Sequence, residues 1–260
     1  MTEKHRKPLG GKCYGHIPHI PGSRTGSGDH KCSEGQARIA TERVRDKYDF
    51  IICTEKVDGS NVGVAKLDGE IIALTRAGYR AYTSPYEQHH IYAKWVYDNK
   101  NRFDGLLQEG ERVCGEWLAQ AHGTRYELTH EPFVAFDIMR GQTRCLHEEI
   151  YDRAGKYGFI NPRIISIGGS LSVSKAVKLI NETSGHGAID SIEGVVWRVE
   201  RNRLKDKHSG QRQWKFDFLC KYVRPDKVDG KYLPEVSGEK AIWNWHPTPS
   251  KESDNGKDGN

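Results

Sequence analysis

The segment Glu55–Asn61 reads EKVDGSN and lies between two runs of β-branched residues. Gly59 allows a tight turn beside Lys56, so the lysine can point into a cleft. An amine attacks only when it is neutral, and nearby cations or a bound metal can lower the pKa of a lysine enough for that at neutral pH. Lys56 is therefore a candidate nucleophile, although an ordinary hairpin turn with solvated charges would have the same letters.

Acidic residues stand inside apolar runs at three places: Glu116 in GEW, Asp137 in AFDI and Glu193 in IEGVV. A buried carboxylate needs a partner, and carboxylates that converge from adjacent strands suit a hard divalent cation. Lys221 in FLCKYVR comes last and is placed to neutralise phosphates. Structural salt bridging is the alternative for any one acid, but the whole ordered set predicts a phosphate-handling site.

The order K-x-D-G, G-E, A-F-D-I, E-G-V-V and a lysine-bearing strand resembles the covalent nucleotidyltransferase superfamily of ligases and RNA capping enzymes. It is most similar to the ATP-dependent RNA ligases of the RNA ligase 2-like kind found in phages and bacteria. The resemblance extends roughly from Tyr14 to Pro234 and includes IPHIPGSRTGSGDH and SPYEQH. It implies an α+β nucleotidyltransferase domain of the ATP-grasp-like ligase type, with antiparallel sheets and flanking helices. Because the stretch after Lys221 is short and its last ten residues are expected to be disordered, we expect no OB domain after the last motif.

The resemblance also implies a reaction. Lys56 would attack the α-phosphorus of ATP, release pyrophosphate and carry a lysyl-AMP, with Lys221 as the second catalytic lysine. AMP would then pass to a 5′-phosphate RNA end, and a 3′-hydroxyl RNA end would displace it, as in RNA repair. The nucleotide-binding residues implied by the resemblance are Glu55, Asp58, Gly59, Asn61, Arg76, Glu116, Phe136, Asp137, Glu193 and Lys215.

Within this set the resemblance assigns roles near the nucleophile. Asp58 and Asn61 would organise the ribose, the metal or a metal-bound water. Glu55 would offer its backbone or carboxylate to the base, and Arg76 would contact the nucleotide sugar or phosphate.

Other roles fall on the acid-bearing strands. Phe136 would stack on adenine, which is worth about 1–3 kcal/mol by analogy with nucleic-acid binding, and Asp137 would support its strand. Glu193, Glu116 and Asp58 would be ligands of Mg²⁺ or Mn²⁺, the ion that offsets charge on the reacting phosphates.

The last motif departs from the family pattern, which has two lysines one residue apart. Here the letters are Leu219-Cys220-Lys221, and the preceding lysine is Lys215. Lys215 would substitute if the strand is bulged, or would be an exposed charge.

The elements that must position these residues are short strands bounded by Gly-containing turns, with fewer helices. Strands are predicted at 49–55, 61–67, 70–75, 112–118, 133–139, 192–199 and 214–222. Helices are predicted at 34–45, 86–99, 147–157 and 173–181, the last capped by Ser172. We expect an arm over 1–48 that packs on a catalytic domain at 49–235, then an extension at 236–260 whose last ten residues are disordered.

The 260-residue chain has a net charge of +5 and no apolar stretch of the length that a membrane span needs. It has no GxxxxGK[ST] loop, which argues against standard nucleotide folds. Residues 198–231 contain eleven Lys/Arg against five Asp/Glu, interleaved with Trp214, Phe216, Phe218 and Tyr222. This composition suits RNA backbone and stacked bases, or a solvated strand edge. We expect a monomer in the cytoplasm, which is the host cytoplasm if the protein is encoded by a phage. The alternatives for end recognition are this chain itself and a separate protein.

Cysteine and histidine leave one further question. Cys13, His16, His19, His30 and Cys32 fall within twenty residues, which is compatible with zinc but matches no common zinc module. Without a secretion signal, we expect reduced cysteines.

Competing functions of other classes are a capping guanylyltransferase, an ATP-dependent DNA ligase and a non-enzymatic RNA-binding module. The two enzymes generally carry an OB domain after the last motif. Covalent AMP, covalent GMP or no label would separate ligases, capping enzymes and binding modules.

Overall fold

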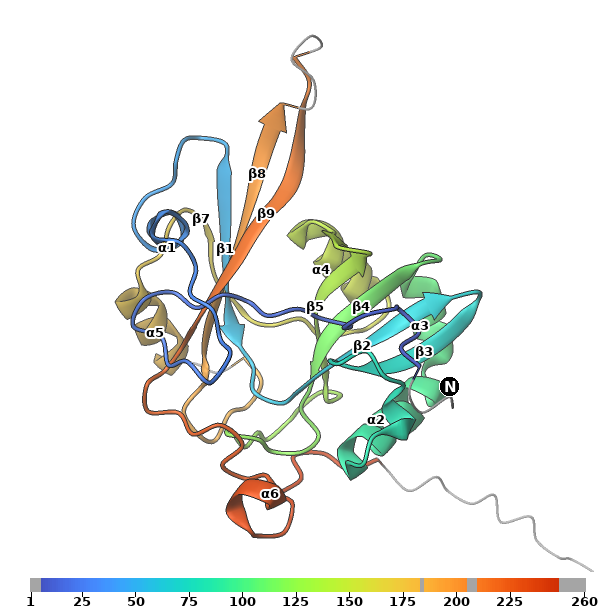
Figure 1. Cartoon of the computed structure of the whole chain (residues 1–260). Coiled ribbons are helices and arrows are strands. Elements are labelled where there is room, and N and C mark those ends of the chain that lie inside the picture. Colours follow the sequence, from blue (N-terminus) through green and yellow to red (C-terminus); the bar gives the residue numbers. More distant parts are fainter. Residues whose placement is uncertain (1–5, 183–184, 205–209, 248–260) are drawn as a thin grey trace, which may run out of the picture.

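Two antiparallel sheets lie side by side in the computed structural model, which describes residues 6–182, 185–204 and 210–247 (Figure 1). The four-stranded sheet has the order β7 (Ile164–Gly168), β1 (Asp49–Lys56), β8 (Gly194–Leu204) and β9 (Arg212–Val223). The five-stranded sheet has the order β3 (Glu70–Thr75), β2 (Ser60–Leu67), β4 (Glu111–Trp117), β5 (Phe133–Arg140) and β6 (Thr143–Arg144). The predicted α+β class with antiparallel sheets is confirmed.

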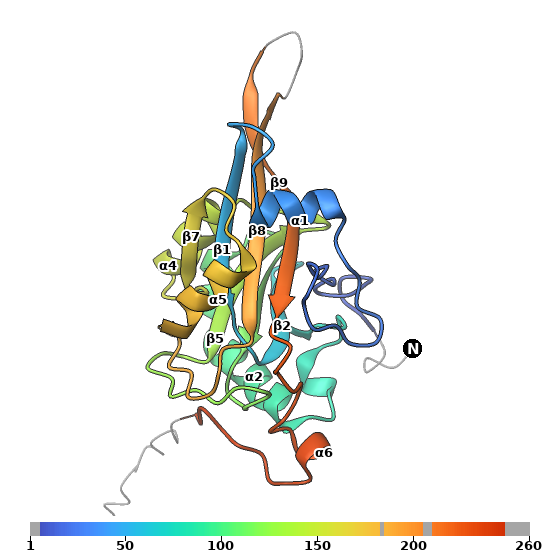
Figure 2. The ribbon, with the colours of Figure 1, turned by 90° about the vertical axis from the view of Figure 1, so that its left-hand side faces the viewer.

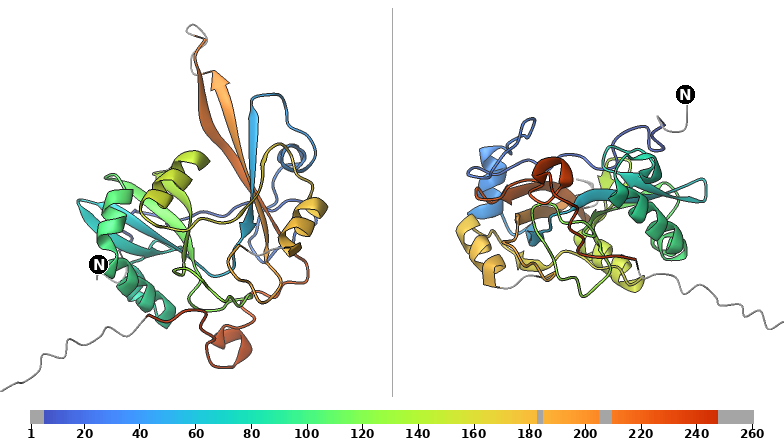
Figure 3. Two further views of the ribbon diagram at one scale, coloured as in Figure 1. Left: turned by 180° about the vertical axis from the view of Figure 1, so that it is seen from behind. Right: turned by 90° about the horizontal axis from the view of Figure 1, so that it is seen from below.

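Helices flank each sheet. Figure 2 shows α1 (Glu34–Thr41) and α5 (Val173–Glu182) against the four-stranded sheet, where Ala40 and Ile180 are buried with Trp197. The other sheet carries α2 (Glu87–Asp98), α3 (Lys100–Leu106) and α4 (His147–Lys156), seen from behind in Figure 3. A 3-10 turn, η2 (Ala81–Thr83), and the short α6 (Pro234–Ser237) complete the described elements. The predicted cap is present, because the Ser172 hydroxyl accepts from Lys175 N.

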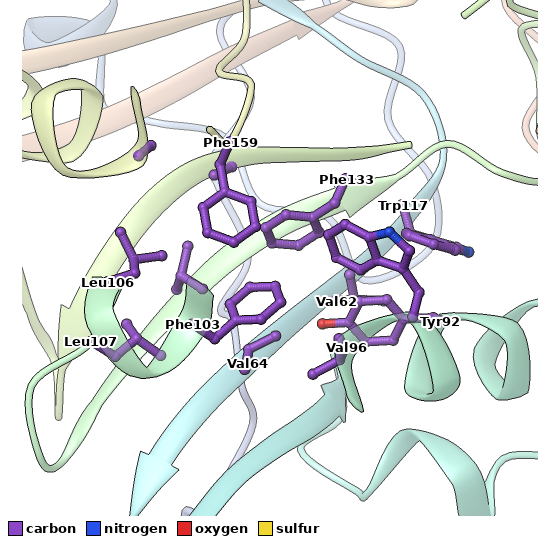
Figure 4. Packing of buried hydrophobic residues seen from close by; sticks show 14 of the residues in the cluster. Val62, Val64, Tyr92, Val96, Phe103, Leu106, Leu107, Trp117, Phe133 and Phe159 are labelled. Atoms are coloured by element: carbon purple, nitrogen blue, oxygen red, sulfur yellow. The ribbon is translucent and has the colours of Figure 1, made fainter. Parts of the chain in front are cut away.

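The larger core is aromatic and joins α2 and α3 to the five-stranded sheet (Figure 4). The rings of Phe103 and Phe159 lie 4.6 Å apart and those of Trp95 and Trp117 5.4 Å apart, centroid to centroid. Offset and edge contacts of this kind add to the free energy of burial. This core therefore holds β4, which carries Glu116, in a fixed position.

The structure adds three short elements that were not predicted, η2, β6 and α6, and β8 extends to Leu204 instead of ending at residue 199. Three longer elements also differ from their prediction. The first helix ends at Thr41 and not at residue 45. The helix α3 was missed because it contains Gly105, which disfavours helix but makes room for the ring of Tyr157. The strand β7 was missed because it is a short edge strand whose Ile167 is 52% exposed.

Residues 6–33 run over both sheets with little regular structure of their own. Cys13 and Tyr14 are buried against the five-stranded sheet, and Arg112 Nε donates to Cys13 O at 2.7 Å. Farther along, Ile20 N donates to Lys221 O at 2.9 Å, which attaches the arm to β9. The arm thus links the two sheets.

The chain after β9 returns to the five-stranded sheet. Ala121 N donates to Ile242 O, and Asn244 N donates to Ala119 O, both at 2.8 Å. The rings of Trp245 and Trp117 are 5.8 Å apart. The residues predicted to be disordered, 251–260, lie outside the described residues.

The long β8–β9 hairpin projects beyond the rest of the fold (Figures 1 and 2). The sequence left open whether its aromatic residues form stacking platforms or a solvated strand edge, and in the structure they do not form a single row. Phe218 is in the core, Tyr222 packs beside it, and Phe216 lies under the Arg198 guanidinium at 5.0 Å. Trp214 is 41% exposed and is the member of this set that can meet a base. No helix among the described residues is both long and apolar enough to span a bilayer.

Candidate active site

Lys56 is the last residue of β1, and Ser60 is the first of β2, so the chain crosses from one sheet to the other within three residues. Gly59 is required in this crossing because a Cβ there would lie 2.5 Å from Trp117 O and 2.9 Å from Leu118 Cδ2. Asp58 N also donates to the Tyr126 hydroxyl at 2.9 Å. These contacts fix the turn that follows Lys56.

Carboxylates from three segments surround the amine. Lys56 Nζ forms an ion pair with Glu193, which directly precedes β8. Glu116 on β4 lies opposite Asn61 on β2, and its Oε1 accepts from Gly59 N at 3.3 Å. The structure therefore brings Lys56, Glu116 and Glu193 together from distant parts of the sequence.

The electrostatics of this cluster hold a proton on the lysine. Burial disfavours the charge on Lys56, but the carboxylates of Glu193, Glu116 and Asp58 outweigh it and raise its pKa. Burial in turn raises the pKa of Glu116 to about 8 and that of Glu193 to about 7, against the attraction of Lys56. The sequence pointed to nearby cations or a bound metal as the means of lowering the pKa of Lys56. In the protein alone the acids outweigh the cations around the amine, and its pKa is raised.

Asp58 turns toward the protein. Its Oδ2 accepts from Gly123 N at 3.1 Å and from the Thr124 hydroxyl at 3.0 Å, and Lys227 Nζ lies 3.8 Å away. Burial raises its pKa. Sequence reasoning missed Lys227, which lies after the last motif.

An apolar cavity opens on one side of Lys56. Its apolar lining is contributed by both sheets and by the arm: Tyr14, Ile17, Val57, Phe136, Pro162, Val196 and Leu219. Tyr14 contacts the Phe136 ring edge-on, with centroids 5.0 Å apart and planes at 67°. This contact fixes the orientation of the aromatic ring that the sequence assigned to stacking.

Some residues that line this cavity have buried polar atoms without a hydrogen-bond partner among the described residues. Glu55 Oε2 accepts from Gly185 N at 2.9 Å, but Glu55 Oε1, Asn61 Oδ1 and His147 Nε2 are buried without a hydrogen bond to any described residue. All three residues line the apolar cavity. A buried polar atom left unpaired costs about 1–3 kcal/mol, so these atoms fit a ligand that presents its own donors and acceptors.

Asp137 is buried and paired with protein side chains. Its carboxylate is paired with Arg144 and with Arg198, 3.4 Å from Oδ1, and the Tyr14 hydroxyl donates to Oδ2 at 3.2 Å. It supports the wall of the cavity, in keeping with the role expected from the sequence.

A second, more open cavity is also lined by Lys56. Polar residues dominate its lining: Asp29, Asp58, Ser60, Asn61, Thr75, Arg76, Ser84, Tyr86, His89, Glu116, His122, Glu193, Lys221 and Asp229. Lys221 borders both cavities, and burial, together with the charge of Lys56, lowers its pKa. Arg76 also borders both, with its Nη2 3.3 Å from His16 Nδ1. Cations at this junction suit phosphate groups.

The structure does not bring Lys215 to the site. Lys215 is exposed and lies opposite Arg201, whereas Lys221 lies opposite Val196. The strand is bulged, with a register shift between Val199 and Glu200, but Lys215 lines neither cavity. Leu219 occupies the position two residues before Lys221 and faces the apolar cavity.

No group of three or more His, Cys, Asp or Glu side chains in the described part of the chain is arranged to hold a metal ion alone. Mg²⁺ usually takes one or two carboxylates, with waters and substrate phosphates as its other ligands. Glu193 and Glu116, whose charges are poorly tolerated without a cation, fit that requirement. Cys13 and Cys32 belong to different buried clusters, so the possible zinc ligands do not converge. All six cysteines are free thiols.

Several cavity residues were missed by sequence reasoning: Tyr14, Ile17, His147, Tyr151 and Arg198. None belongs to a motif with regular spacing. His147 and Tyr151, with ring centroids 4.1 Å apart, come from α4, and only the tertiary fold brings that helix to the cavity. Ile17 and Asp29 both lie in a stretch that the resemblance did single out, although it gave neither residue a role.

Comparison with known proteins gives a consistent result. The family described as RNA ligase matches residues 49–223, which run from the first residue of β1 to the last of β9. No curated protein matches the sequence.

Among solved structures, an archaeal ATP-dependent RNA ligase is 21% identical over 68% of this chain and 43% of its own, with a TM-score of 0.42. A Naegleria gruberi RNA ligase variant with ATP and Mn is 15% identical over 84% of this chain and 61% of its own, with a TM-score of 0.45. The chain thus spans less than two thirds of the length of either protein. The family match covers most of this chain, from the nucleophile candidate to Lys221, and the chain belongs to the RNA ligase family.

Proposed function

We propose that this protein is an ATP-dependent RNA ligase that works through a lysyl-AMP on Lys56. The observation that carries the proposal is the position of Lys56 at the border of an apolar cavity with an aromatic wall and an open cavity with cations. A nucleoside fits the first cavity and phosphates fit the second, which leaves the α-phosphorus next to the amine.

The adenine would enter the apolar cavity and stack on Phe136. The unpaired Glu55 Oε1 is a hydrogen-bond acceptor for an exocyclic amino group, which adenine has and guanine lacks at the same ring position. Asn61 Oδ1 is a second acceptor, suited to a ribose hydroxyl. These atoms favour ATP over GTP, and hence a ligase over a capping enzyme.

In the first step, Lys56 Nζ passes a proton to solvent and forms a bond to the α-phosphorus, while the bond from that phosphorus to the pyrophosphate oxygen breaks and pyrophosphate leaves. Arg76 and Lys221 would hold the phosphates. A 5′-phosphate RNA end then takes the AMP and frees the lysine. Finally, a 3′-hydroxyl attacks the activated phosphate, AMP leaves, and a phosphodiester bond remains.

Glu193 and Glu116 would hold a divalent cation, Mg²⁺ or Mn²⁺, with Asp58 nearby. When bound, the ion would neutralise these carboxylates and the phosphates and so weaken the hold on the lysine proton. The raised pKa values of Glu116 and Glu193 support this assignment, because burial makes both carboxylate charges costly and the attraction of Lys56 does not offset that cost.

We also infer that residues 49–235 form the catalytic domain, with 1–48 packed on it and 236–260 as an extension. We propose that the partner is RNA and that the enzyme acts as a cytoplasmic monomer. A separate protein could recognise the RNA ends.

Intact mass after incubation with ATP and Mg²⁺ tests the proposal. We expect wild-type protein to gain the mass of one AMP and Lys56→Ala to gain none. GTP in place of ATP is the control. An adduct on Lys56→Ala would overturn the assignment of the nucleophile, and an adduct formed with GTP would indicate a capping enzyme.

A gel assay with matched nicked substrates then tests the second substrate. We expect sealing when the 3′-hydroxyl strand is RNA, because the 2′-hydroxyl is the group by which a protein distinguishes RNA from DNA. Equal sealing of an all-DNA nick would refute the RNA assignment while leaving the lysyl-AMP in place.

A further inference from the structure

Lys227 lies outside the stretch that matches the family and is buried, with 7% of its surface exposed. Its Nζ donates to Gly123 O at 2.9 Å, to Thr124 Oγ1 at 2.7 Å and to Ser191 O at 2.9 Å. An ammonium has three protons, so these acceptors use all of them. Lysine is rarely this buried, and removing its charge from water costs free energy unless hydrogen bonds and an opposite charge compensate.

The acceptors of Lys227 lie in two segments, one that holds the Lys56 turn through Asp58 and one that leads into Glu193. On one side, Gly123 N and the Thr124 hydroxyl donate to Asp58 Oδ2, and Asp58 is two residues after Lys56. On the other side, Ser191 is two residues before Glu193. Lys227 Nζ is thus hydrogen-bonded to both supports at once.

The turn that contains Lys227 adds a backbone contact to the same place. Lys227 N donates to Arg224 O at 3.2 Å, and Arg224 N donates to Glu193 O at 3.0 Å. The segment that directly follows β9 therefore holds Glu193 by two hydrogen bonds, one to the carbonyl of Glu193 and one to the carbonyl of Ser191.

We propose that Lys227 is a positioning residue that sets the distance between the Lys56 turn and the Glu193 segment. The inference rests on the proposed function, since it concerns the rate at which Lys56 becomes adenylylated. Lys227 lines neither cavity, so it acts through Asp58, Thr124 and Ser191. The positive charges of Lys227 and Lys56 both stabilise the Asp58 carboxylate, whereas the carboxylate of Asp229 repels it.

Lys227→Met keeps the length of the side chain and removes the charge and the hydrogen bonds. A displacement of about 1 Å in a catalytic group can cost about 100-fold in rate. We expect the kcat of lysyl-AMP formation to fall by about 10- to 100-fold, with the KM for ATP changed less than about twofold because Lys227 itself lines neither cavity. Lys66→Met is the matched control. Lys66 lines neither cavity, and its Nζ lies 2.7 Å from Asp104 Oδ1 in an ion pair.

A double-mutant cycle separates positioning from general loss of structure. Thr124→Val removes the hydroxyl between Lys227 and Asp58 without a change of volume, and it serves if Lys227→Met does not fold. We expect Thr124→Val to lower kcat in the wild-type background and to have little further effect in Asp58→Asn, with thermal melting measured for every variant.

The possible outcomes distinguish this inference from the proposed function. A wild-type protein that gains no AMP overturns both. A labelled wild type together with an unchanged kcat in Lys227→Met, or equal losses of Thr124→Val in both backgrounds, overturns only the role of Lys227.

Discussion

Glu193 is in contact with Lys56 because Gly194, its neighbour in sequence, pairs with Lys56 across β1 and β8. A Cβ on residue 194 would collide with Tyr222 O on β9, so the close approach of three strands depends on this glycine. The ion pair is therefore built into the backbone pairing, and the protonation of Lys56 depends on the charge of its neighbour.

A pH dependence follows from this pairing. The carboxylates raise the pKa of Lys56, so the neutral amine becomes more abundant as pH rises, and lysyl-AMP formation at limiting Mg²⁺ should increase between pH 6 and pH 9. Glu193→Gln removes the negative charge that contributes most to raising the pKa of Lys56, so it should move this rise to lower pH. The maximum should be lower because a proposed metal ligand is removed.

Initial rates of AMP labelling across this range measure the effect. Glu70→Gln, whose partner Arg80 lies at the surface, is the control and should keep the wild-type profile. An unchanged profile in Glu193→Gln would contradict the electrostatic account of Lys56.

Glu116 should destabilise the protein at alkaline pH. Burial raises its pKa to about 8 from an ordinary value of 4.5, so the folded state binds this proton more tightly than the unfolded state does. The resulting stability is full below the unfolded pKa and is lost as pH rises through the folded pKa. Glu116→Gln keeps an acceptor for Gly59 N and removes the titration.

We therefore expect Glu116→Gln to be more stable than wild type at pH 9 by on the order of 1–3 kcal/mol, and to differ less at pH 5. Denaturant unfolding at both values, without metal or nucleotide, checks this. A variant that loses as much stability as wild type between pH 5 and pH 9 would show that Glu116 is not the group responsible.

The sequence predicted those features that depend on local pattern. Lys56, Glu116 and Glu193 were recognisable because a charged residue inside an apolar strand needs a partner, and the strands around them were found from their β-branched runs. The direction of the Lys56 pKa was not predictable, because it depends on which charges lie nearest in space. The sequence left open whether Lys215 reaches the site, because the register of β9 against β8 is set by tertiary pairing. It missed Lys227 because no residue near Lys227 in the sequence signals burial.

Phe136 should control the affinity for ATP. Loss of the aromatic face in Phe136→Leu removes stacking worth about 1–3 kcal/mol, which corresponds to an increase in the KM for ATP of about 5- to 150-fold. Phe136→Tyr keeps the ring and should stay within a few-fold of wild type. Labelling as a function of ATP concentration measures KM, and equal KM values for Phe136→Leu and wild type would place the base elsewhere.

Lys221 and Lys215 stand on the same strand and should behave differently. Lys221 borders both cavities, so Lys221→Ala removes a cation from the junction where phosphates react, and we expect AMP transfer to slow by about 10- to 100-fold, which is about 1.4–2.7 kcal/mol. Lys215→Ala removes an exposed charge and should leave this step within about twofold. A single-turnover assay with pre-adenylylated enzyme and a 5′-phosphate RNA end isolates the step, and melting temperatures of both variants exclude misfolding. If Lys215→Ala slows AMP transfer as much as Lys221→Ala does, then the last motif uses both lysines and the hairpin must bend toward Lys56 when RNA is bound.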